Sequence, residues 1–294
     1  MEFSLIIGTL NRSKELAVCL DSLLEQKFKN FEVIVIDQSD NCETEVLVKR
    51  FGRLTIHYYH VEFKGLSRAR NFGLSLARGR YFALIDDDAG YSPDYLLNAY
   101  HYLNLKKHII LSGYIIDATN GKTLPEYRKV SEGSVLSLRQ VVRIAPSPAL
   151  IFPMELYHSG ISFDEDFGVG SVFGAWEETD MILQAMDRGY KVIYLRRMEV
   201  KHPTIPHSFE LENDSVLKKR ENYACGFGAL IVKDKLVRCN NRLVAVKMEK
   251  WIRIAVKLSG LLGKEKKEEG KYECRGMRRG MRIYSARMEG ENDT

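Results

Sequence analysis

The sequence has no apolar run long enough to cross a membrane. A spanning helix needs roughly 18 or more consecutive apolar residues, and no stretch of this chain approaches that length. The first residues, MEFSLIIGTLNRSKE, have neither a basic leader nor a small-residue cleavage site, so they predict a buried strand and no signal peptide. We therefore expect a cytoplasmic protein.

Cysteines and phosphate-binding glycine loops are also scarce. The five cysteines are scattered and none has C-x-x-C spacing, which argues against a zinc site or a disulfide framework. No G-x-x-x-x-G-K-[ST] loop and no G-x-G-x-x-G turn follows a strand-like run. Ordinary ATPases and Rossmann dinucleotide enzymes therefore lose their main sequence support.

The composition suits a globular protein with a basic C-terminal part. The 294 residues are 45% hydrophobic and 28% charged, which is enough for one large domain, or for one domain with an appendage. The net charge of +5 is uneven, because residues 231–294 hold 17 Lys and Arg against 9 Asp and Glu. The basic character therefore belongs to the C-terminal residues.

Apolar runs and helical patterns alternate through the first hundred residues. The strand-like runs are 3–7, 31–37, 54–60 and 80–86. The helical patterns lie near 13–26, 43–51 and 66–78. Because helix-length segments join buried strands, the alternation predicts an α/β fold with a parallel sheet, and ligands at the carboxyl ends of its strands.

Polar clusters follow three of these strands. GTLNR (8–12) follows the first, DQSD (37–40) ends the second and DDD (86–88) follows the fourth. A single aspartate at a strand end is commonly a loop cap, but three adjacent carboxylates repel one another and need a counter-cation. The triple aspartate therefore predicts a divalent metal site, and oxygen ligands favour Mg²⁺ or Mn²⁺ over Zn²⁺.

Basic residues precede the triple aspartate. Lys64, Arg68 and Arg70 stand where a helix begins after the third strand, and arginines at a helix N-terminus favour an anion. An anion that faces a carboxylate-bound metal is the arrangement expected of a diphosphate. The sequence therefore indicates a nucleoside diphosphate with a group attached.

Four stretches together carry a family resemblance. They are IIGTLNRSKELAVCLDSLLEQ, FEVIVIDQSD, GLSRARNFGLSLARGRYFALIDDDA and FGAWEETDMILQAMDRGYKVIYL. In this order and spacing they resemble the family 2 glycosyltransferases of the GT-A fold over roughly residues 2–230. The resemblance implies a Rossmann-like, mostly parallel sheet flanked by helices. It also implies a metal-dependent glycosyltransferase that uses a nucleotide-sugar donor.

The resemblance assigns the first two polar clusters to the nucleotide. Thr9, Asn11 and Arg12 would line the nucleotide pocket. Asp37 would hydrogen-bond the base, which is expected to be uracil, and Arg68 would approach the base or the diphosphate. A UDP-linked sugar is therefore the expected donor.

The resemblance assigns the third cluster to the metal and the sugar. Asp86 would contact the ribose and the sugar and serve as a metal ligand, and Asp88 would hold Mn²⁺ or Mg²⁺ against the diphosphate. Asp87, the middle residue, should point away from both neighbours in an extended backbone. His202 is a further candidate for the metal or the diphosphate, although a lone histidine is often structural.

The acidic segment Trp176-Glu177-Glu178-Thr179-Asp180 opens a helical pattern, and carboxylates are favoured in the first turn of any helix. The resemblance places the catalytic base on Glu178, which would accept the proton of the acceptor hydroxyl. Glu177 and Asp180 are the alternatives and candidate acceptor contacts, and Trp176 would pack on the acceptor sugar. One base without a second nucleophile implies inversion by single displacement.

The expected organisation has two catalytic halves and an extension. Residues 1–117 would bind the nucleotide sugar, residues 118–230 would bind the acceptor, and residues 231–294 would form a basic helical extension. The acceptor would be a saccharide or lipid-linked saccharide, as in cell-surface polysaccharide synthesis. The alternative is a non-catalytic module that binds nucleotide sugars or acts as a scaffold. A sugar nucleotidyltransferase would need a glycine-rich first loop, which GTLNR is not.

The residues from 243 to 262 predict an amphipathic basic helix. Its apolar residues are Val244, Met248, Trp251, Ala255, Leu258 and Leu262, and its basic side holds Lys247, Lys250, Arg253 and Lys257. It could lie in the plane of an anionic membrane, on the inner face of the cytoplasmic membrane, with residues 271–284 as a second basic element. Alternatively, its apolar face packs on the catalytic domain while its lysines stay solvated. No nucleic-acid-binding motif is present.

Overall fold

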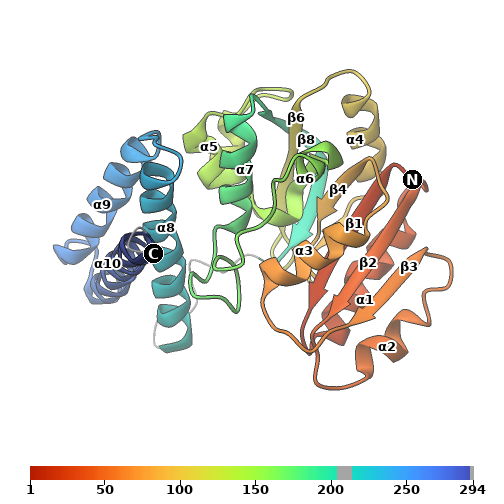
Figure 1. Ribbon diagram of the computed structural model, residues 1–294, viewed down its shortest axis with the longest axis horizontal. Helices are drawn as coiled ribbons and strands as arrows, with labels where there is room; N and C mark the ends of the chain where they lie inside the picture. The colour runs from red at the N-terminus through yellow and green to blue at the C-terminus, as the bar shows by residue number, and fades with distance from the viewer. Residues whose placement is uncertain (204–213, 292–294) are drawn as a thin grey trace. The chain divides into compact units, whose positions relative to one another are not determined.

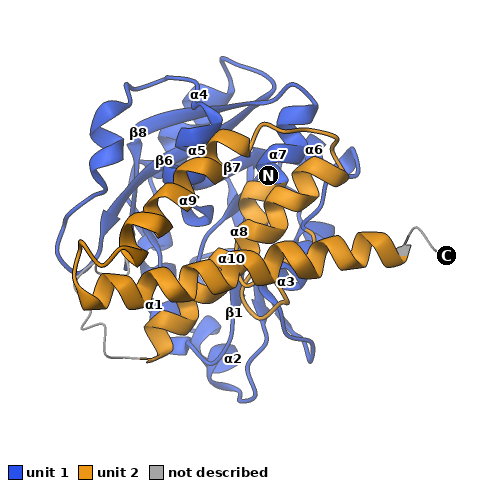
Figure 2. Cartoon of the chain, turned by 90° about the vertical axis from the view of Figure 1, so that its left-hand side faces the viewer, with its two compact units in different colours: residues 1–163, 181–204 blue, residues 164–180, 205–294 orange. Residues whose placement is uncertain are grey.

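The computed structural model describes residues 1–203 and 214–291, and the chain forms two compact units (Figures 1 and 2). Unit 1 comprises residues 1–163 and 181–204, and unit 2 comprises residues 164–180 and 205–294. The boundary passes through helix α7 (Glu177–Asp187), whose first turn belongs to unit 2. The units are defined by packing, so the functional division at residue 230 stays a prediction.

Within the described residues, unit 1 is built on an eight-stranded sheet in the order β3-β2-β1-β4-β7-β6-β8-β5. The strands are β1 Phe3–Thr9, β2 Phe31–Asp37, β3 Ile56–His60, β4 Tyr81–Leu84, β5 Gly90–Tyr91, β6 Ile109–Asp117, β7 Leu150–Pro153 and β8 Lys191–His202. The first four run parallel, as the sequence predicts. Strand β7 is antiparallel to β4 and β6, and β5 is antiparallel to β8. The sheet is therefore mixed but mostly parallel.

Helices cover both faces of this sheet (Figure 1). They are α1 Ser13–Leu24, α2 Glu43–Val48, α3 Leu66–Leu76, α4 Tyr95–Leu103, α5 Leu138–Ile144 and α6 Met154–His158, with 3-10 turns η1 Pro125–Lys129 and η2 Ser147–Ala149. In β2, Val33 and Val35 join the main core, whereas Ile34 and Ile36 pack with Ala69 of α3. Because both faces are covered, the strands read as continuous apolar runs.

The parallel register brings three strand ends to one edge of the sheet. Thr9, the last residue of β1, pairs with Asp37, the last residue of β2. On the other side, Ile6 of β1 pairs with Leu84, where β4 ends and leads into the triple aspartate. The predicted polar clusters therefore lie at the same edge.

Unit 2 consists of residues 164–180 and three long helices, α8 Asp214–Leu236, α9 Val244–Leu258 and α10 Lys264–Glu291 (Figure 2). Helices α8 and α10 approach closely because Gly276 and Gly280 of α10 face the backbone of α8. A Cβ atom at either position would clash with the carbonyl oxygen of Glu221 or of Cys225. The two glycines therefore permit a backbone approach that side chains would prevent.

Helix α9 turns two of its lysines inward. Lys257 lies 3.0 Å from Glu269 and 2.9 Å from Glu273 of α10, and Lys250 lies 3.7 Å from Glu273. Both glutamates are buried. The prediction of one solvated basic side is therefore wrong for Lys250 and Lys257, because buried carboxylates on the neighbouring helix require cationic partners. No helix in the described ranges combines the length and hydropathy that a membrane span requires.

Candidate functional site

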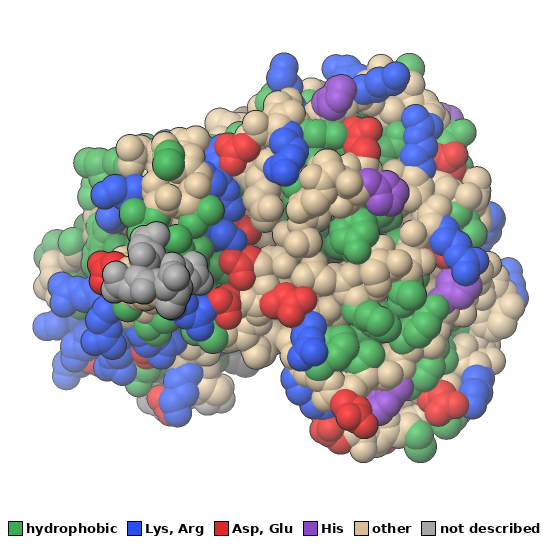
Figure 3. Space-filling model, in the orientation of Figure 1, with side chains coloured by type: hydrophobic (Ala, Val, Ile, Leu, Met, Phe, Trp, Pro, Cys, Tyr) green, Lys and Arg blue, Asp and Glu red, His purple; other side chains and the backbone are tan. Residues whose placement is uncertain are grey.

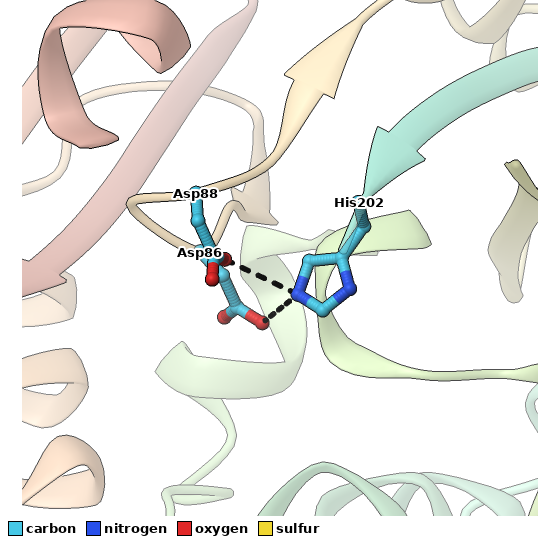
Figure 4. A group of neighbouring side chains, drawn as sticks. All are labelled: Asp86, Asp88 and His202. Atoms are coloured by element: carbon cyan, nitrogen blue, oxygen red, sulfur yellow. Dashed lines mark ion pairs between the residues drawn. The ribbon is translucent and has the colours of Figure 1, made fainter. Parts of the chain in front are cut away.

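Asp86 and Asp88, which follow β4, lie beside His202 at the end of β8 (Figure 4). The Nε2 atom of His202 is 3.6 Å from Asp86 and 3.2 Å from Asp88. One ligand atom from each of the three residues falls within 4.8 Å of the others. Two carboxylates and an imidazole at this spacing suit a divalent cation, and the mixed oxygen and nitrogen donors suit Mn²⁺ better than Mg²⁺.

The three side chains stabilise one another's charges. Burial disfavours a charged imidazole, but hydrogen bonds to Asp86 and Asp88 outweigh it and raise the pKa of His202 to about 9. Burial also disfavours the Asp88 carboxylate, yet hydrogen bonds from His202 and Arg12 hold the pKa of Asp88 well below its usual range. A positive charge is therefore favoured between the two aspartates.

Asp87 is turned toward β1 and away from this group. Its carboxylate accepts a hydrogen bond from the Thr9 hydroxyl at 2.8 Å and lies 3.0 Å from a guanidinium nitrogen of Arg12. Burial raises the pKa of Asp87 to about 7, although Arg12 and Thr9 act in the opposite direction. Thr9 and Asp87 thus tie the end of β1 to the loop after β4, as the extended-backbone argument expects of the middle residue.

Two arginines hold the outer aspartates. Arg12 donates to Asp88 at 2.6 Å from the start of α1. Arg70, from α3, donates to Asp86 at 2.9 Å and to the hydroxyl of Ser147 at 3.0 Å. Charge-assisted hydrogen bonds of this kind fix both the position and the ionisation of a carboxylate. These hydrogen bonds therefore hold the carboxylates of Asp86 and Asp88 in place without any ligand.

Asn11 and Asp37 hold the loop that contains Ser39 and Asp40, which follows β2. Asn11 has a φ of 55°, in the left-handed region that asparagine tolerates better than most residues. Its backbone N–H donates to the hydroxyl of Ser39 at 2.8 Å, and its side-chain oxygen accepts from the N–H of Asp40 at 3.1 Å. Asp37 is fully buried and accepts from the backbone N–H of Ser39 at 2.9 Å.

A surface cavity of about 560 Å³ opens where β2 and β3 end. Its lining includes Ser39, Asp40, Tyr58, His60 and Lys64. The phenol of Tyr58 donates to Asp37 at 2.8 Å, so the cavity lies directly beside that buried carboxylate. This volume and its mixed polar and aromatic lining suit a planar polar ring such as a nucleobase.

Arg68 lies over an aromatic ring, and its predicted contact with the base or the diphosphate stays a prediction. Its guanidinium lies 4.3 Å from the centre of the Phe63 ring, and its side chain is exposed. Arg70, two residues later on the same helix, is 1% exposed and bonded to Asp86. The structure thus brings together Asp86, Asp88 and His202, and adds Arg70, while Arg68 is held on an aromatic ring.

The acidic first turn of α7, in unit 2, is half-buried at Glu178 and buried at Glu177 and Asp180. Glu178 is half-buried, and Glu177 is 5% exposed. Asp180 is completely buried and lies 2.9 Å from the ammonium group of Lys233. Arg238 also donates to Asp180. The carboxylate of Asp180 therefore forms ion pairs with two buried cations of unit 2, Lys233 and Arg238.

Trp176 precedes this helix in a strained conformation. Its φ is 80°, which costs a non-glycine residue of the order of 1–3 kcal/mol. The indole N–H donates to the carbonyl oxygen of Tyr223 at 2.7 Å, and the indole ring lies 4.8 Å from the ring of Phe227. These contacts with α8 hold the half-buried Trp176 side chain in place.

The sequence did not single out several residues of these networks. Ser147 and Lys233 gave no signal, because their partners are 61 and 53 residues away and only the fold brings them together. Arg70 was noted beside Arg68, but which of the two faces inward depends on how α3 is rotated about its axis. Arg70 lies on the same face of α3 as the buried Ala69 and Gly73, and this position favours Arg70 over Arg68 as the buried arginine.

The chain is similar to known proteins at the level of sequence. A family model described as "Glycosyl transferase family 2" matches residues 4–156. An uncharacterized glycosyltransferase of Rickettsia bellii is 31% identical over 183 residues, which are 59% of this chain and 26% of that protein. The Escherichia coli protein WfaP, named a UDP-Glc:alpha-D-GlcNAc-diphosphoundecaprenol beta-1,3-glucosyltransferase, is 30% identical over 105 residues, covering 35% of this chain and 42% of its own.

The fold is also similar to a solved structure. The mannosyltransferase PcManGT from Pyrobaculum calidifontis, in complex with GDP-Man and Mn²⁺, superposes with a TM-score of 0.65 at 16% identity, covering 95% of this chain and 87% of that one. The chain spans between 26% and 57% of the length of the first five curated relatives that it matches. The structural similarity to PcManGT supports the predicted GT-A architecture.

Proposed function

Because the chain belongs to glycosyltransferase family 2, we propose that it transfers a sugar from a nucleotide-sugar donor to a hydroxyl of a saccharide or lipid-linked saccharide. The observation that carries this proposal is the group formed by Asp86, Asp88 and His202 at the carboxyl edge of the sheet. Ligands of open α/β sheets bind at this edge. The relative WfaP, whose name specifies a UDP-glucose donor and a GlcNAc-diphosphoundecaprenol acceptor, supports the same reaction class.

The acidic group would hold Mn²⁺ or Mg²⁺ through Asp86, Asp88 and His202. A bound divalent cation neutralises the charge that develops on a departing diphosphate. Arg70 keeps Asp86 ionised and oriented, since it donates to this carboxylate from a buried position. Arg12 does the same for Asp88. These five residues would thus form the donor side of the reaction.

The nucleoside would lie in the cavity at the ends of β2 and β3. Asp37 is the predicted partner of the base, and Tyr58 orients its carboxylate. Thr9 acts through Asp87, because its hydroxyl donates to that carboxylate. Asn11 holds the loop at Ser39 and Asp40 in a shape that leaves the cavity open. Uracil remains the proposed base, and a UDP-linked sugar the proposed donor.

Glu178 is the proposed base for the acceptor. In a single displacement the acceptor oxygen bonds to the anomeric carbon, the bond from that carbon to the diphosphate breaks, and the hydroxyl proton passes to the carboxylate of Glu178. The stereochemistry at the anomeric carbon is then inverted. Glu178 lies in the first turn of α7, where the helix dipole favours the ionised carboxylate. Glu177 and Trp176 are the proposed acceptor contacts.

Titration calorimetry tests the donor site. The purified chain would be titrated with UDP, GDP, CDP and dTDP, each with and without Mn²⁺. We expect one of them, UDP, to bind only when Mn²⁺ is present. The Asp88→Asn variant should lose this metal-dependent binding, whereas Asp94→Asn, which removes an exposed carboxylate paired with Lys27, should bind like the wild type. Failure of all four nucleotides to bind would contradict the proposal.

The alternative function is a module that binds nucleotide sugars without transferring them. It shares the donor site, so calorimetry cannot separate the two. Turnover assays with labelled donor and a mixture of saccharide and lipid-linked acceptors do so. Metal-dependent donor binding without any transfer would favour the binding module.

A further inference from the structure

Helix α9 carries an apolar stripe on its outward side. Val244, Met248, Ile252 and Val256 recur every four residues and have 44%, 60%, 61% and 42% of their surfaces exposed. Because residues four apart lie on the same helix face, the four side chains form one continuous stripe. The turn after α9 extends it with Leu261, which is 84% exposed.

The opposite side of α9 faces the rest of unit 2. Ile254 is 1% exposed, and Lys250 and Lys257 pair with carboxylates of α10. Two lysines of α9 therefore lie on its inward side, beside the buried Ile254, while four large apolar side chains lie on its outward side. Single exposed apolar residues are ordinary, but a contiguous stripe on a soluble surface marks an interaction site.

Helix α10 presents a cationic stripe on its own outward side. Its exposed members are Lys264, Lys267, Lys271, Arg275, Arg278 and Arg282. Among the residues that the structure describes, Arg278 and Arg282 have no ion-pair partner. Glu269 and Glu273 of this helix are buried, whereas Glu268 is exposed and pairs with Lys271. In Figure 3, hydrophobic side chains gather over α9 and Lys and Arg side chains below them, toward α10.

We propose that these two stripes form a docking surface for an anionic lipid bilayer. The α9 stripe and Leu261 would enter the boundary between headgroups and acyl chains, with α9 lying in the membrane plane. The α10 stripe would bind lipid phosphates, and each cation near such a surface adds to the attraction. This surface shares Val244, Met248 and the basic residues of 271–284 with the one that the sequence pattern predicts, but Lys250 and Lys257 take no part in it.

Charge complementarity selects the bilayer over the other occupants. A second copy of this chain docked through the same surface would bring a second row of Lys and Arg against the first, and like charges that face each other across an interface disfavour association. A nucleic acid would complement the α10 stripe, but its phosphates offer nothing to Met248 or Ile252. An anionic bilayer supplies both negative headgroups and hydrocarbon.

Vesicle flotation with the full chain tests the surface, with no nucleotide present, so that its outcome is independent of glycosyl transfer. The wild type should float with vesicles of phosphatidylglycerol and phosphatidylcholine, and far less with phosphatidylcholine alone. Met248→Glu combined with Ile252→Glu should abolish flotation. The matched control, Val18→Glu with Leu105→Glu, places the same charges at two apolar residues of unit 1 that are 67% and 80% exposed, and should float like the wild type.

The cationic stripe has its own variant. Arg278→Gln with Arg282→Gln should weaken binding to the anionic vesicles about thirtyfold, whereas Arg50→Gln with Arg53→Gln, which removes two exposed charges of unit 1, should not. Circular dichroism checks that each variant is folded.

Three flotation and assembly results would overturn the bilayer proposal, and one competition result would reassign the surface. The first three are a wild type that ignores anionic vesicles, an equal loss in the stripe variant and its control, and a wild-type dimer that the Met248 and Ile252 substitutions dissociate without any vesicle binding. Displacement of the protein from vesicles by short duplex DNA, with undiminished DNA binding by the α9 variant, would assign the surface to nucleic acid instead.

Discussion

Arg70 donates a hydrogen bond to Asp86 from α3, and only 1% of the arginine side chain is exposed while 26% of the aspartate side chain is. The buried member of this pair is the cation, and the carboxylate reaches toward the site. Removal of the arginine would leave Asp86 without its inner partner, although His202 still lies 3.6 Å away. The pair therefore connects the stability of the fold with the charge of the candidate metal site.

We expect Arg70→Met to lower the free energy of unfolding by about 3 kcal/mol, because breaking a buried ion pair leaves an uncompensated charge. Chemical denaturation with urea measures the change. The control is Lys27→Met, which breaks an exposed pair with Asp94 and should cost less than about 1 kcal/mol. Equal losses in the two variants would show that the buried position of Arg70 does not matter.

Glu178→Gln should leave metal-dependent nucleotide binding unchanged and reduce sugar transfer by about 10²–10⁴-fold, because an amide cannot accept the hydroxyl proton. A turnover assay with calorimetry on the same preparation separates the two effects. Asp187→Asn, at the exposed far end of the same helix, is the matched control and should turn over like the wild type. Full activity in Glu178→Gln would remove the base from this residue.

Gly280→Ala should destabilise unit 2, because the new Cβ atom would clash with the carbonyl oxygen of Cys225. Overpacking of this kind costs about 1–3 kcal/mol. Gly290→Ala, on the same helix with open space around it, should instead leave stability unchanged or raise it by up to about 1 kcal/mol. Thermal melting of both variants, followed by circular dichroism, shows a lower melting temperature for Gly280→Ala alone if the packing of α10 on α8 is as described.

Asp180→Asn distinguishes an acceptor contact from a structural carboxylate. Its side chain is completely buried beside Lys233 and Arg238, so loss of the charge should cost about 3 kcal/mol of unfolding free energy. Asp164→Asn, whose side chain pairs with Lys233 but is 26% exposed, should cost less. An acceptor KM that rises while the denaturation midpoint stays constant would identify Asp180 as an acceptor contact instead.

Local patterns predicted the first half of the sheet well. Strands β1 to β4 and the helices between them follow from apolar runs and helical periodicity, because both are properties of neighbouring residues. The antiparallel strand β7 did not follow. It enters between β4 and β6, and nothing in four residues of apolar sequence specifies which strands they pair with or in which direction.

The site shows the same limit at the level of side chains. The residue types of the triple aspartate predict a metal site, the family resemblance adds His202, and the structure brings Asp86, Asp88 and His202 together. The choice between Arg68 and Arg70 depended on the rotation of α3, which tertiary packing decides. On α9, apolar residues lie on both sides of the helix, so their pattern does not show which side faces inward. Ion pairs with Glu269 and Glu273 of α10, which follows α9 in the chain, determine the inward side.

Both tryptophans of the chain belong to unit 2: Trp176 lies before α7, and Trp251 is half-buried on α9. Unit 1 contains tyrosine and phenylalanine but no tryptophan. Tryptophan fluorescence excited at long wavelength therefore comes from unit 2 alone. With Trp176→Phe, the remaining emission comes from Trp251 alone, next to Ile252 of the α9 stripe, so this single-tryptophan variant carries an optical reporter of the proposed docking surface.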